Sequence, residues 1–201
     1  VDWYGRATAA YYGAKKGCEE LHAQYAYDDD SVCVVNSLYK DFTGLRVTAR
    51  VLNMDMAVKA ERDAVVDVIS DGKTEAFKLE WPRGLTRTYF LHLELRDSSD
   101  ALVSDNLYWL STVPETPSKP AYTPQGGFAV NRDSWADLTG LRELPRVGLE
   151  AKAASDARDG ERTIDVSLRN PSKTVAFAVR LAVHKGRDGE EVAPCYWTEN
   201  Y

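Results

Sequence analysis

The stretch Arg87-Thr-Tyr-Phe-Leu-His-Leu-Glu-Leu-Arg96 decides the fold of this chain. Apolar residues recur at every second position, and successive side chains of a β-strand point to opposite faces of a sheet. The alternation therefore predicts a strand with one buried and one solvated face. The residues expected in the core are Tyr89, Leu91, Leu93 and Leu95. The residues expected on the outer face are Phe90, His92, Glu94 and Arg96.

Similar segments, rich in Val, Leu and Tyr, flank this stretch and are separated by turn-forming residues. They are His22–Tyr27, Ser31–Tyr39, Leu45–Asn53, Lys59–Ile69, Glu75–Leu79 and Ala101–Leu110. About seven strands in roughly ninety residues are typical of an immunoglobulin-like sandwich, which we expect over residues 22–112. The Cys…Trp…Cys arrangement of antibody domains is missing, so only the architecture is predicted.

A single amphipathic helix precedes these strands. Residues from about Ala7 to Leu21 include no proline and favour a helix. The residues expected to share its apolar face are Tyr11, Ala14, Cys18 and Leu21. A lone helix cannot bury that face against itself. The segment 1–21 therefore either packs on the sheet domain or belongs to a preceding domain.

A proline-rich linker, expected over residues 113–145, separates the first β region from a second one. Four prolines fall between Thr112 and Pro124, which indicates an extended and fairly stiff chain. Residues 146–201 then show four strand patterns. These patterns lie near residues 147–153, near residues 164–168, at Val175–Val183 and at Val192–Trp197. Four strands are half a sandwich, so we expect a second, partial immunoglobulin-like domain that is cut short or completed by another chain.

Composition and charge exclude several classes of function. The chain has 201 residues, 44% of them hydrophobic, and a formal net charge of −6. That balance disfavours a nucleic-acid-binding protein, which would normally present a basic face. No apolar run approaches the ~18–20 residues of a membrane span, so no membrane partner is expected either.

Metal, cofactor and catalytic sites are not predicted. Cys18, Cys33 and Cys195 form no C-x-x-C pair and are expected to be small buried hydrophobes, with a Cys18–Cys33 bridge as the alternative. The histidines lie in three separate strands, and we expect ordinary surface or edge positions for them. They are His22, His92 and His184. The run from Asp28 to Asp30 is either a calcium ligand set or a solvated hairpin turn, and the missing EF-hand pattern favours the turn.

Aromatic residues offer the best indication of a binding function, because aromatic rings stack on the faces of sugars. The candidates are Trp81, Trp109, Trp135, Trp197, Tyr39 and Tyr122. Aromatic side chains more often fill cores and interdomain contacts. Trp81 and Trp135 lie in loop-like sequence, so these two are the residues we expect to contact sugar.

Several ordered stretches resemble glycoside hydrolase family 2, in its exo-β-D-glucosaminidase and endo-β-mannosidase members. Asp2-Trp-Tyr-Gly-Arg6, Ala10-Tyr-Tyr-Gly-Ala-Lys-Lys16 and His22-Ala-Gln-Tyr25 resemble the end of the catalytic barrel and the entry to the next domain. Asn106-Leu-Tyr-Trp-Leu-Ser-Thr112 is similar to the end of the following sandwich. The stretches from Asn170 to Phe177 and from Trp197 to Tyr201 resemble the last sandwich.

The resemblance implies a mainly β, C-terminal, non-catalytic region. In the family, two glutamates on the catalytic barrel carry out the reaction. The barrel segments that contain these glutamates do not occur in this sequence, so no catalytic residue is carried over. The implied partners are the catalytic barrel of the parent glycosidase and its oligosaccharide substrate, with no cofactor and a secreted or periplasmic location. A stand-alone carbohydrate-binding or protein-assembly module is the alternative.

Overall fold

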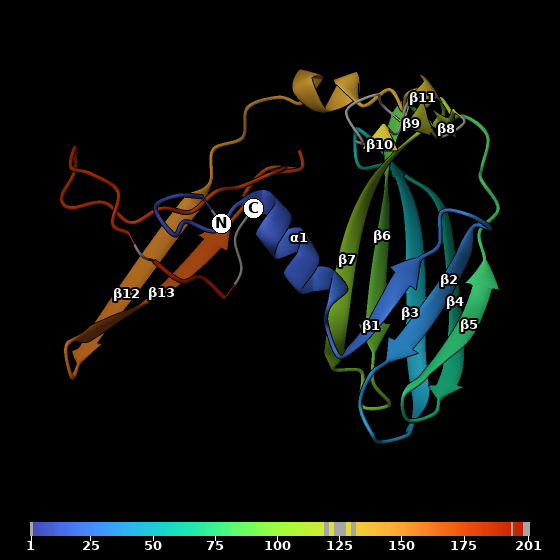
Figure 1. Cartoon of the computed structure of the whole chain (residues 1–201), viewed down its shortest axis with the longest axis horizontal. Coiled ribbons are helices and arrows are strands. Elements are labelled where there is room, and N and C mark those ends of the chain that lie inside the picture. The colour runs from blue at the N-terminus through green and yellow to red at the C-terminus, as the bar shows by residue number, and fades with distance from the viewer. Residues whose placement is uncertain (1, 119–120, 123–127, 130–131, 194, 199–201) are drawn as a thin grey trace. The chain divides into compact units, whose positions relative to one another are not determined.

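A computed structural model describes residues 2–118, 121–122, 128–129, 132–193 and 195–198 (Figure 1). The chain divides into two compact units. One consists of Val1–Cys18 with Pro145–Tyr201, and the other is Glu19–Leu144. Among the described residues, no helix has the length and apolar character that crossing a bilayer requires.

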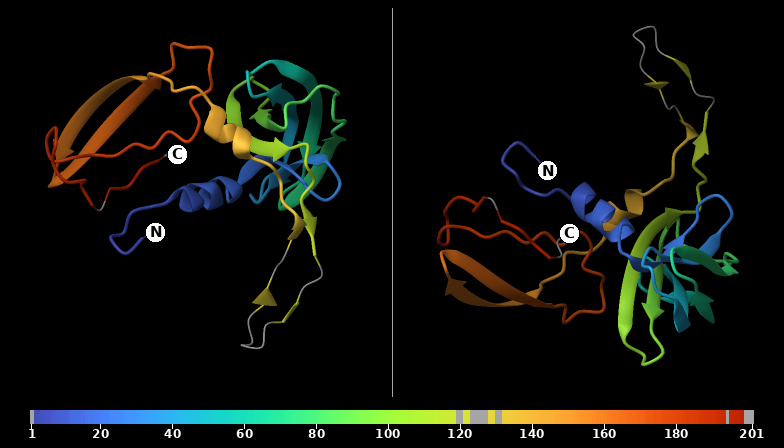
Figure 2. Two further views of the ribbon diagram at one scale, coloured as in Figure 1. Left: turned by 90° about the horizontal axis from the view of Figure 1, so that it is seen from above. Right: turned by 60° about the horizontal axis from the view of Figure 1, so that its bottom comes forward.

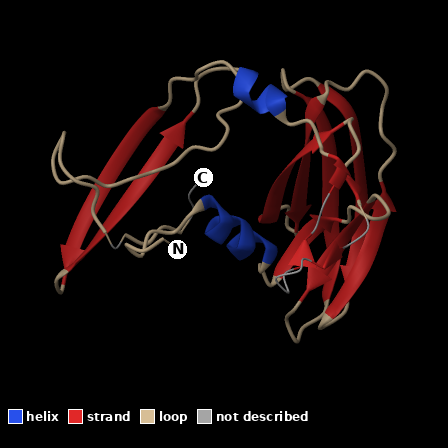
Figure 3. Ribbon diagram, turned by 45° about the horizontal axis from the view of Figure 1, so that its top comes forward, coloured by secondary structure: helices blue, strands red, loops and turns tan. Residues whose placement is uncertain are grey.

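The unit Glu19–Leu144 is built on two antiparallel sheets that stack face to face (Figure 3). One sheet has the order β1-β2-β5, and the other has the order β4-β3-β6-β7. The strands of the first are β1 (Leu21–Tyr25), β2 (Ser31–Asn36) and β5 (Gly72–Lys78). The strands of the second are β3 (Phe42–Asn53), β4 (Val58–Val68), β6 (Thr88–Arg96) and β7 (Leu102–Ser111). These strands confirm the predicted immunoglobulin-like sandwich.

The core lies between the sheets and follows the alternation of β6. Leu91, Leu93 and Leu95 are fully buried, and Tyr89 is 5% exposed, as the period-two pattern predicts. The three leucines lie opposite apolar residues of β3, for example Leu93 opposite Ala49, whereas Tyr89 lies opposite Asn53. The β1-β2-β5 sheet supplies the other side of the core, chiefly through residues such as Val32 and Val34.

Phe90 departs from the prediction. It lies on the outer side of β6 by alternation, yet it is fully buried. Residues beyond the sandwich cover this end of the sheet. Thr88, on the same side of the strand, donates a hydrogen bond to the carbonyl of Asp137, and a Cβ atom added at Gly140 would lie only 3.0 Å from Thr88 Oγ1. The alternation of one strand cannot reveal a segment that returns from far along the chain.

The covering segment comes from the region expected to be a linker. After β7 the chain leaves the sandwich, pairs β8 (Thr116–Pro117) with β11 (Arg132–Ser134), and returns as the 3-10 helix η1 (Thr139–Glu143) (Figure 2). Between them, β9 (Ala121–Tyr122) pairs with β10 (Phe128–Ala129). Prolines suit such short, edge-like strands because they have no N–H to donate.

The other unit contains α1 (Ala9–Gly17), which is shorter than the predicted helix. Tyr12, not Tyr11, is its buried residue, and both Ala14 and Cys18 are exposed. The predicted apolar face is therefore wrong. Leu21, its fourth expected member, belongs to β1 instead.

The same unit contains one hairpin, formed by β12 (Glu150–Arg158) and β13 (Glu161–Arg169). The strands predicted at Val175–Val183 and Val192–Trp197 are absent from the described residues there, where a single bridge joins His184 to Glu191. A strand forms only where a neighbouring backbone satisfies its hydrogen bonds. β12 and β13 pair with each other, and no further ladder extends this hairpin among the described residues.

Candidate functional site

An aromatic cluster closes one end of the sandwich. Tyr25, at the end of β1, makes edge-to-face contacts with Tyr27 at 4.9 Å, Tyr108 at 5.8 Å and Trp81 at 5.9 Å between ring centroids. Trp81 also meets the ring of Tyr89 at 5.4 Å. These five residues are called the aromatic cluster below. They meet because β1, β6, β7 and the loop after β5 all bring their aromatic residues to this end.

Hydrogen bonds hold the cluster's hydroxyl groups. The Tyr25 hydroxyl donates to Asp30 Oδ1 at 2.5 Å, and the Tyr108 hydroxyl accepts from the Tyr25 amide at 3.1 Å. Burial raises the pKa of Tyr25 and, to about 12, the pKa of Tyr89; the nearby carboxylate of Asp30 acts in the same direction. Both phenols therefore stay protonated near neutral pH and position rings rather than transfer protons.

Trp81 is part of this cluster rather than a free loop residue. Its side chain is half-buried and packs against the core. The most exposed ring of the cluster belongs to Tyr27, which is 70% exposed. Sequence reasoning missed Tyr27. Its position directly before the acidic turn from Asp28 to Asp30 was the available signal.

Trp135 is well exposed, at 67%, and lies beside an ion pair. The guanidinium of Arg132 lies 5.9 Å from the centroid of the Trp135 ring and pairs with the carboxylate of Glu115. Glu115 also affects Tyr27, whose pKa is raised by partial burial, by Tyr108 and by the negative charge of Glu115. Through its ion pair with Arg132, Glu115 belongs to the surroundings of the Trp135 ring.

The acidic turn is held by ordinary hairpin contacts. Asp29 accepts hydrogen bonds from the Ser31 amide at 3.1 Å and from Lys78 Nζ at 2.8 Å. These bonds, that of Lys78 first, lower the pKa of Asp29 to about 2. Across the described ranges, no group of three or more His, Cys, Asp or Glu is arranged to hold a metal ion.

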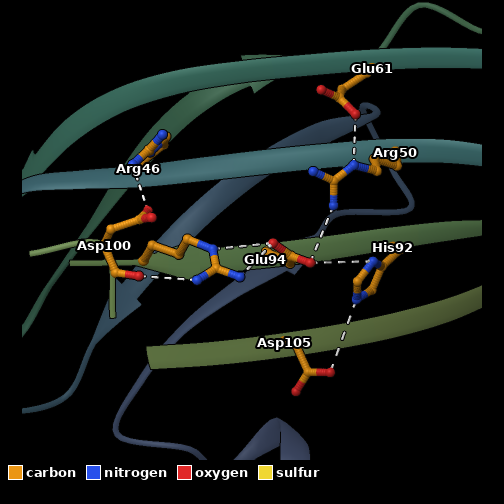
Figure 4. Close-up of polar contacts among 8 residues, drawn as sticks. Arg46, Arg50, Glu61, His92, Glu94, Asp100 and Asp105 are labelled. Carbon is orange, nitrogen blue, oxygen red and sulfur yellow. Dashed lines mark hydrogen bonds and ion pairs between the residues drawn. The ribbon is translucent and has the colours of Figure 1, made fainter. Parts of the chain in front are cut away.

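A network of ion pairs, called the charged lattice below, lies on the outer face of the β4-β3-β6-β7 sheet (Figure 4). Arg50 is at its centre and joins Glu61 at 2.6 Å to Glu94 at 3.2 Å. Glu94 also pairs with Arg96 at 3.3 Å and faces His92 at 3.9 Å. These contacts confirm the outward positions predicted for His92, Glu94 and Arg96.

The charged lattice alternates basic and acidic side chains, and two further pairs extend it. His92 faces Asp105 at 4.0 Å, and Arg46 pairs with Asp100 at 2.6 Å. The neighbouring carboxylates, Glu61 first, raise the pKa of Arg50. Alternating charges across strands stabilise a sheet face. This arrangement is suited to stiffening the sheet and does not resemble an acid/base pair.

The remaining predicted positions have mixed outcomes. His22 is buried, with Nδ1 2.6 Å from the carbonyl oxygen of Glu19, and it lies on β1, an edge strand of its sheet, so it has the edge position of the prediction and not the surface one. His184 is exposed. The cysteines are free, and only Cys33 is buried, whereas Cys18 is exposed and Cys195 is half-buried. The expectation of three buried thiols is therefore wrong.

The other aromatic candidates are scattered. Trp109 is 46% exposed on β7, and Tyr39 is 92% exposed in the turn after β2. Trp197 is half-buried. The side chain of Tyr122 lies outside the described residues.

Comparison with known proteins assigns both β regions. A model of the mannosidase Ig/CBM-like domain matches residues 30–113, and a model of the exo-β-D-glucosaminidase Ig-fold domain matches residues 128–201. An exo-β-D-glucosaminidase of Streptomyces avermitilis is 37% identical over all of this chain, which spans 22% of that relative. One of Amycolatopsis orientalis is 38% identical over 99% of the chain and 19% of the relative.

A solved structure agrees. The crystal structure of the A. orientalis exo-chitosanase CsxA matches 96% of this chain and 23% of its own, with a TM-score of 0.84 and 34% identity. The chain thus spans about a fifth of the length of the relatives it matches. Taken together, the two family models, the identity along the whole chain and the structural match show that the chain belongs to the immunoglobulin-like region of the exo-β-D-glucosaminidases of glycoside hydrolase family 2.

Proposed function

We propose that this chain is the non-catalytic, structural part of an enzyme that removes glucosamine units from β-linked chains. The observation that carries the proposal is the similarity along the whole chain to exo-β-D-glucosaminidases of which it forms only about a fifth. The partner is then the catalytic barrel of the parent glycosidase, and the oligosaccharide is the parent's substrate.

The carboxylates of the sandwich support a non-catalytic role. Retaining glycosidases need two carboxyl groups about 5–5.5 Å apart on either side of the scissile bond. In the charged lattice, each of Glu61, Glu94 and Asp100 is engaged by an arginine on an open sheet face. Arginines of the same sheet therefore hold these carboxylates, which is the arrangement of a structural ion-pair network rather than of an acid and a nucleophile that flank a substrate.

The rigid core supports a scaffolding role. Side chains on β3 and β6 are fully buried, and the lattice ties β3, β4 and β6 together on the other side. A sheet fixed on both faces is a firm support for a neighbouring domain. We propose that it buttresses the barrel and shapes one wall of the substrate cleft.

Turnover by the isolated chain tests the proposal. The 201-residue chain and the full-length parent are each assayed on p-nitrophenyl β-D-glucosaminide and p-nitrophenyl β-mannoside. We expect hydrolysis of the glucosaminide by the parent and none by the chain. Robust turnover by the chain would show that it is catalytic. A parent that cleaves only the mannoside would contradict the proposed substrate.

The exposed rings of Tyr27 and Trp135 favour a second candidate, an independent carbohydrate-binding module, and Trp81 and Trp135 remain its proposed sugar contacts. A module of this kind binds chitosan or mannan oligosaccharides saturably without the barrel and loses binding on Trp81→Ala or Trp135→Ala. A protein-assembly module, the third reading, would instead form oligomers detectable by light scattering. If the chain is monomeric and binds neither polysaccharide, the structural role is the one candidate function that remains.

A further inference from the structure

We propose that an ion pair between Arg6 and Glu191 fastens the segment expected to end the catalytic barrel to the second immunoglobulin-like region, so that this region also supports the barrel of the parent glycosidase. The inference deepens the proposed function and rests on it, because the barrel is the partner named there. Val1–Cys18 and Pro145–Tyr201 form one compact unit, which contains both residues. The pair is called the clasp below.

Arg6 is held by a braced loop. Asp2 Oδ1 accepts hydrogen bonds from the backbone amides of Tyr4 and Arg6, each at 2.9 Å. Gly5 adopts a φ of 75°, which the turn between them requires and which glycine tolerates without strain. The Arg6 guanidinium lies 5.1 Å from the centroid of the Tyr4 ring. A side chain held in this way loses little conformational freedom when it pairs with a partner.

Glu191 is held by a short hairpin over residues 183–192. The Val192 amide donates a hydrogen bond to the Val183 carbonyl at 2.7 Å, and a β-bridge pairs Glu191 with His184. The side chain of Glu191 is 21% exposed, so it is more shielded from water than an ordinary surface glutamate. Both members of the clasp are therefore positioned by backbone contacts of their own segments.

The Glu191 carboxylate lies between two guanidinium groups. Its Oε1 accepts a hydrogen bond from Arg180, and its Oε2 lies 3.9 Å from Arg6 Nε. Arg6 Nε is buried and has no hydrogen-bond partner within the part of the chain that the structure describes. The bond from Arg180, and the positive charges of Arg180, Arg6 and His184, lower the pKa of Glu191. Removing this carboxylate would leave a buried donor of a charged group without compensation, which is costly.

A second contact joins the same two parts of the chain. Lys15, in the last turn of α1, donates a hydrogen bond to the backbone carbonyl of Thr198. The loop before α1 and the end of α1 are thus both attached to residues 180–198. A segment attached at two places cannot move as a body without breaking both contacts. It can therefore transmit support to the part of the parent that precedes it, which we expect to be the barrel.

Hydrogen–deuterium exchange of the 201-residue chain tests the clasp. Glu191→Gln keeps the shape of the side chain and removes its charge. It should make the amides of residues 4–17 exchange about fivefold faster, the factor that one ion pair supplies. Glu190→Gln is the matched control, because Glu190 is exposed and adjacent in sequence, so the same charge is removed outside the clasp. Slow exchange of β6 amides in both variants verifies that the chain remains folded.

A double-mutant cycle separates the pair from its surroundings. Arg6→Gln should accelerate the same amides, and Arg6→Gln combined with Glu191→Gln should accelerate them no more than the larger single change does. Full additivity of the two changes would overturn the proposal. So would an unchanged rate in Glu191→Gln, or equal acceleration in Glu190→Gln.

The full-length parent tests whether the clasp supports the barrel. Barrel peptides next to the clasp should also exchange faster in Glu191→Gln, by up to about fivefold, and should be unchanged in Glu190→Gln. Unchanged barrel exchange in Glu191→Gln would overturn the inference and leave the proposed function standing. Turnover of p-nitrophenyl β-D-glucosaminide is measured separately on the unmodified parent. A parent without that turnover would contradict the proposed function, whereas exchange of the barrel peptides would still decide the inference.

Discussion

Leu93 is one of the inward-facing residues of β6, and its burial stabilises the fold. It is fully buried and lies opposite Ala49 on β3. Leu93→Ala should lower the free energy of unfolding by about 2–5 kcal/mol, because it removes buried methyl groups and leaves a cavity. Urea denaturation followed by circular dichroism measures the loss.

The matched control is Leu102→Ala, at a leucine that is 53% exposed at the start of β7. A substitution there should change the free energy of unfolding by no more than about 0.5–1 kcal/mol. Equal losses at the two positions would mean that burial does not determine the contribution of leucine in this sandwich.

Asp137 is the residue that attaches the returning segment to the sheet. Its Oδ1 accepts hydrogen bonds from the Thr139 hydroxyl at 2.6 Å and the Thr139 amide at 3.1 Å, and its Oδ2 pairs with Arg87 at 3.0 Å. These contacts, those of Thr139 first, lower the pKa of Asp137 to about 2. The carboxylate is therefore favoured in the folded state relative to the unfolded state, where an aspartate has a pKa near 3.9.

The sign of the pH dependence follows. A lowered pKa contributes stability that is complete above the unfolded value and is lost as pH falls towards the folded value. We expect the contribution of Asp137 to be constant above about pH 5 and to fade between about pH 4 and 2. NMR titration of the Asp137 carboxyl carbon measures the pKa directly. Asp137→Asn should make the stability of the chain less dependent on pH in that window, and an unchanged profile would contradict the assignment.

Single residues also show which positions can be predicted from the sequence and which cannot. The inward positions of Leu91, Leu93 and Leu95 were predictable, because period two depends only on neighbours along the strand. The surroundings of His22 and Trp81 could not be predicted in this way. His22 is buried beside the carbonyl of Glu19, and Trp81 joins rings brought from β1 and β6. Such positions depend on contacts between elements that a linear pattern does not contain.

At the scale of elements, the predicted strands of the first sandwich match the observed ones because each has turn residues at its ends. The strands predicted at Val175–Val183 and Val192–Trp197 have the same apolar pattern but lack a partner ladder among the described residues. A sequence pattern states which face a strand would bury, and pairing decides whether the strand forms. Of the exposed rings at the candidate site, Trp135 was named from the sequence, whereas Tyr27 was not.

The helix η1 provides a test at this scale. A Cβ atom at Gly140 would lie 3.0 Å from Thr88 Oγ1 and 3.2 Å from Thr88 Cβ, closer than most real contacts of this kind. Gly140→Ala should therefore loosen η1 from β6 and destabilise the unit by about 1–3 kcal/mol, the range for overpacking. Amides of residues 137–143 should exchange faster with solvent, as measured by hydrogen–deuterium exchange.

Gly148→Ala is the control for this change, because a Cβ atom there has nothing within 4 Å. Its exchange pattern and stability should match those of the unmodified chain. If Gly140→Ala behaves in the same way, η1 does not pack tightly on Thr88.

At the scale of the whole molecule, the two units differ in how their strands are protected. The unit Glu19–Leu144 has a core with many side chains less than 2% exposed. In the hairpin of the other unit, every residue of β12 is exposed, and only Ile164 and Val166 of β13 are half-buried. A two-stranded hairpin is at best marginally stable in water without packing on a further element.

Hydrogen–deuterium exchange on the intact chain tests this difference. Amides of β3 and β6 should exchange only through global unfolding, whereas those of β12 and β13 should exchange through local opening at much lower free energy. We therefore expect the hairpin peptides to be deuterated orders of magnitude faster than the β6 peptide at neutral pH. Val166→Ala should leave the slow exchange of β6 unchanged, and Leu93→Ala should accelerate it. Equal protection of β6 and β13 would instead mean that the hairpin's apolar residues, Ile164 and Val166, are buried in a core as firm as that of the sandwich.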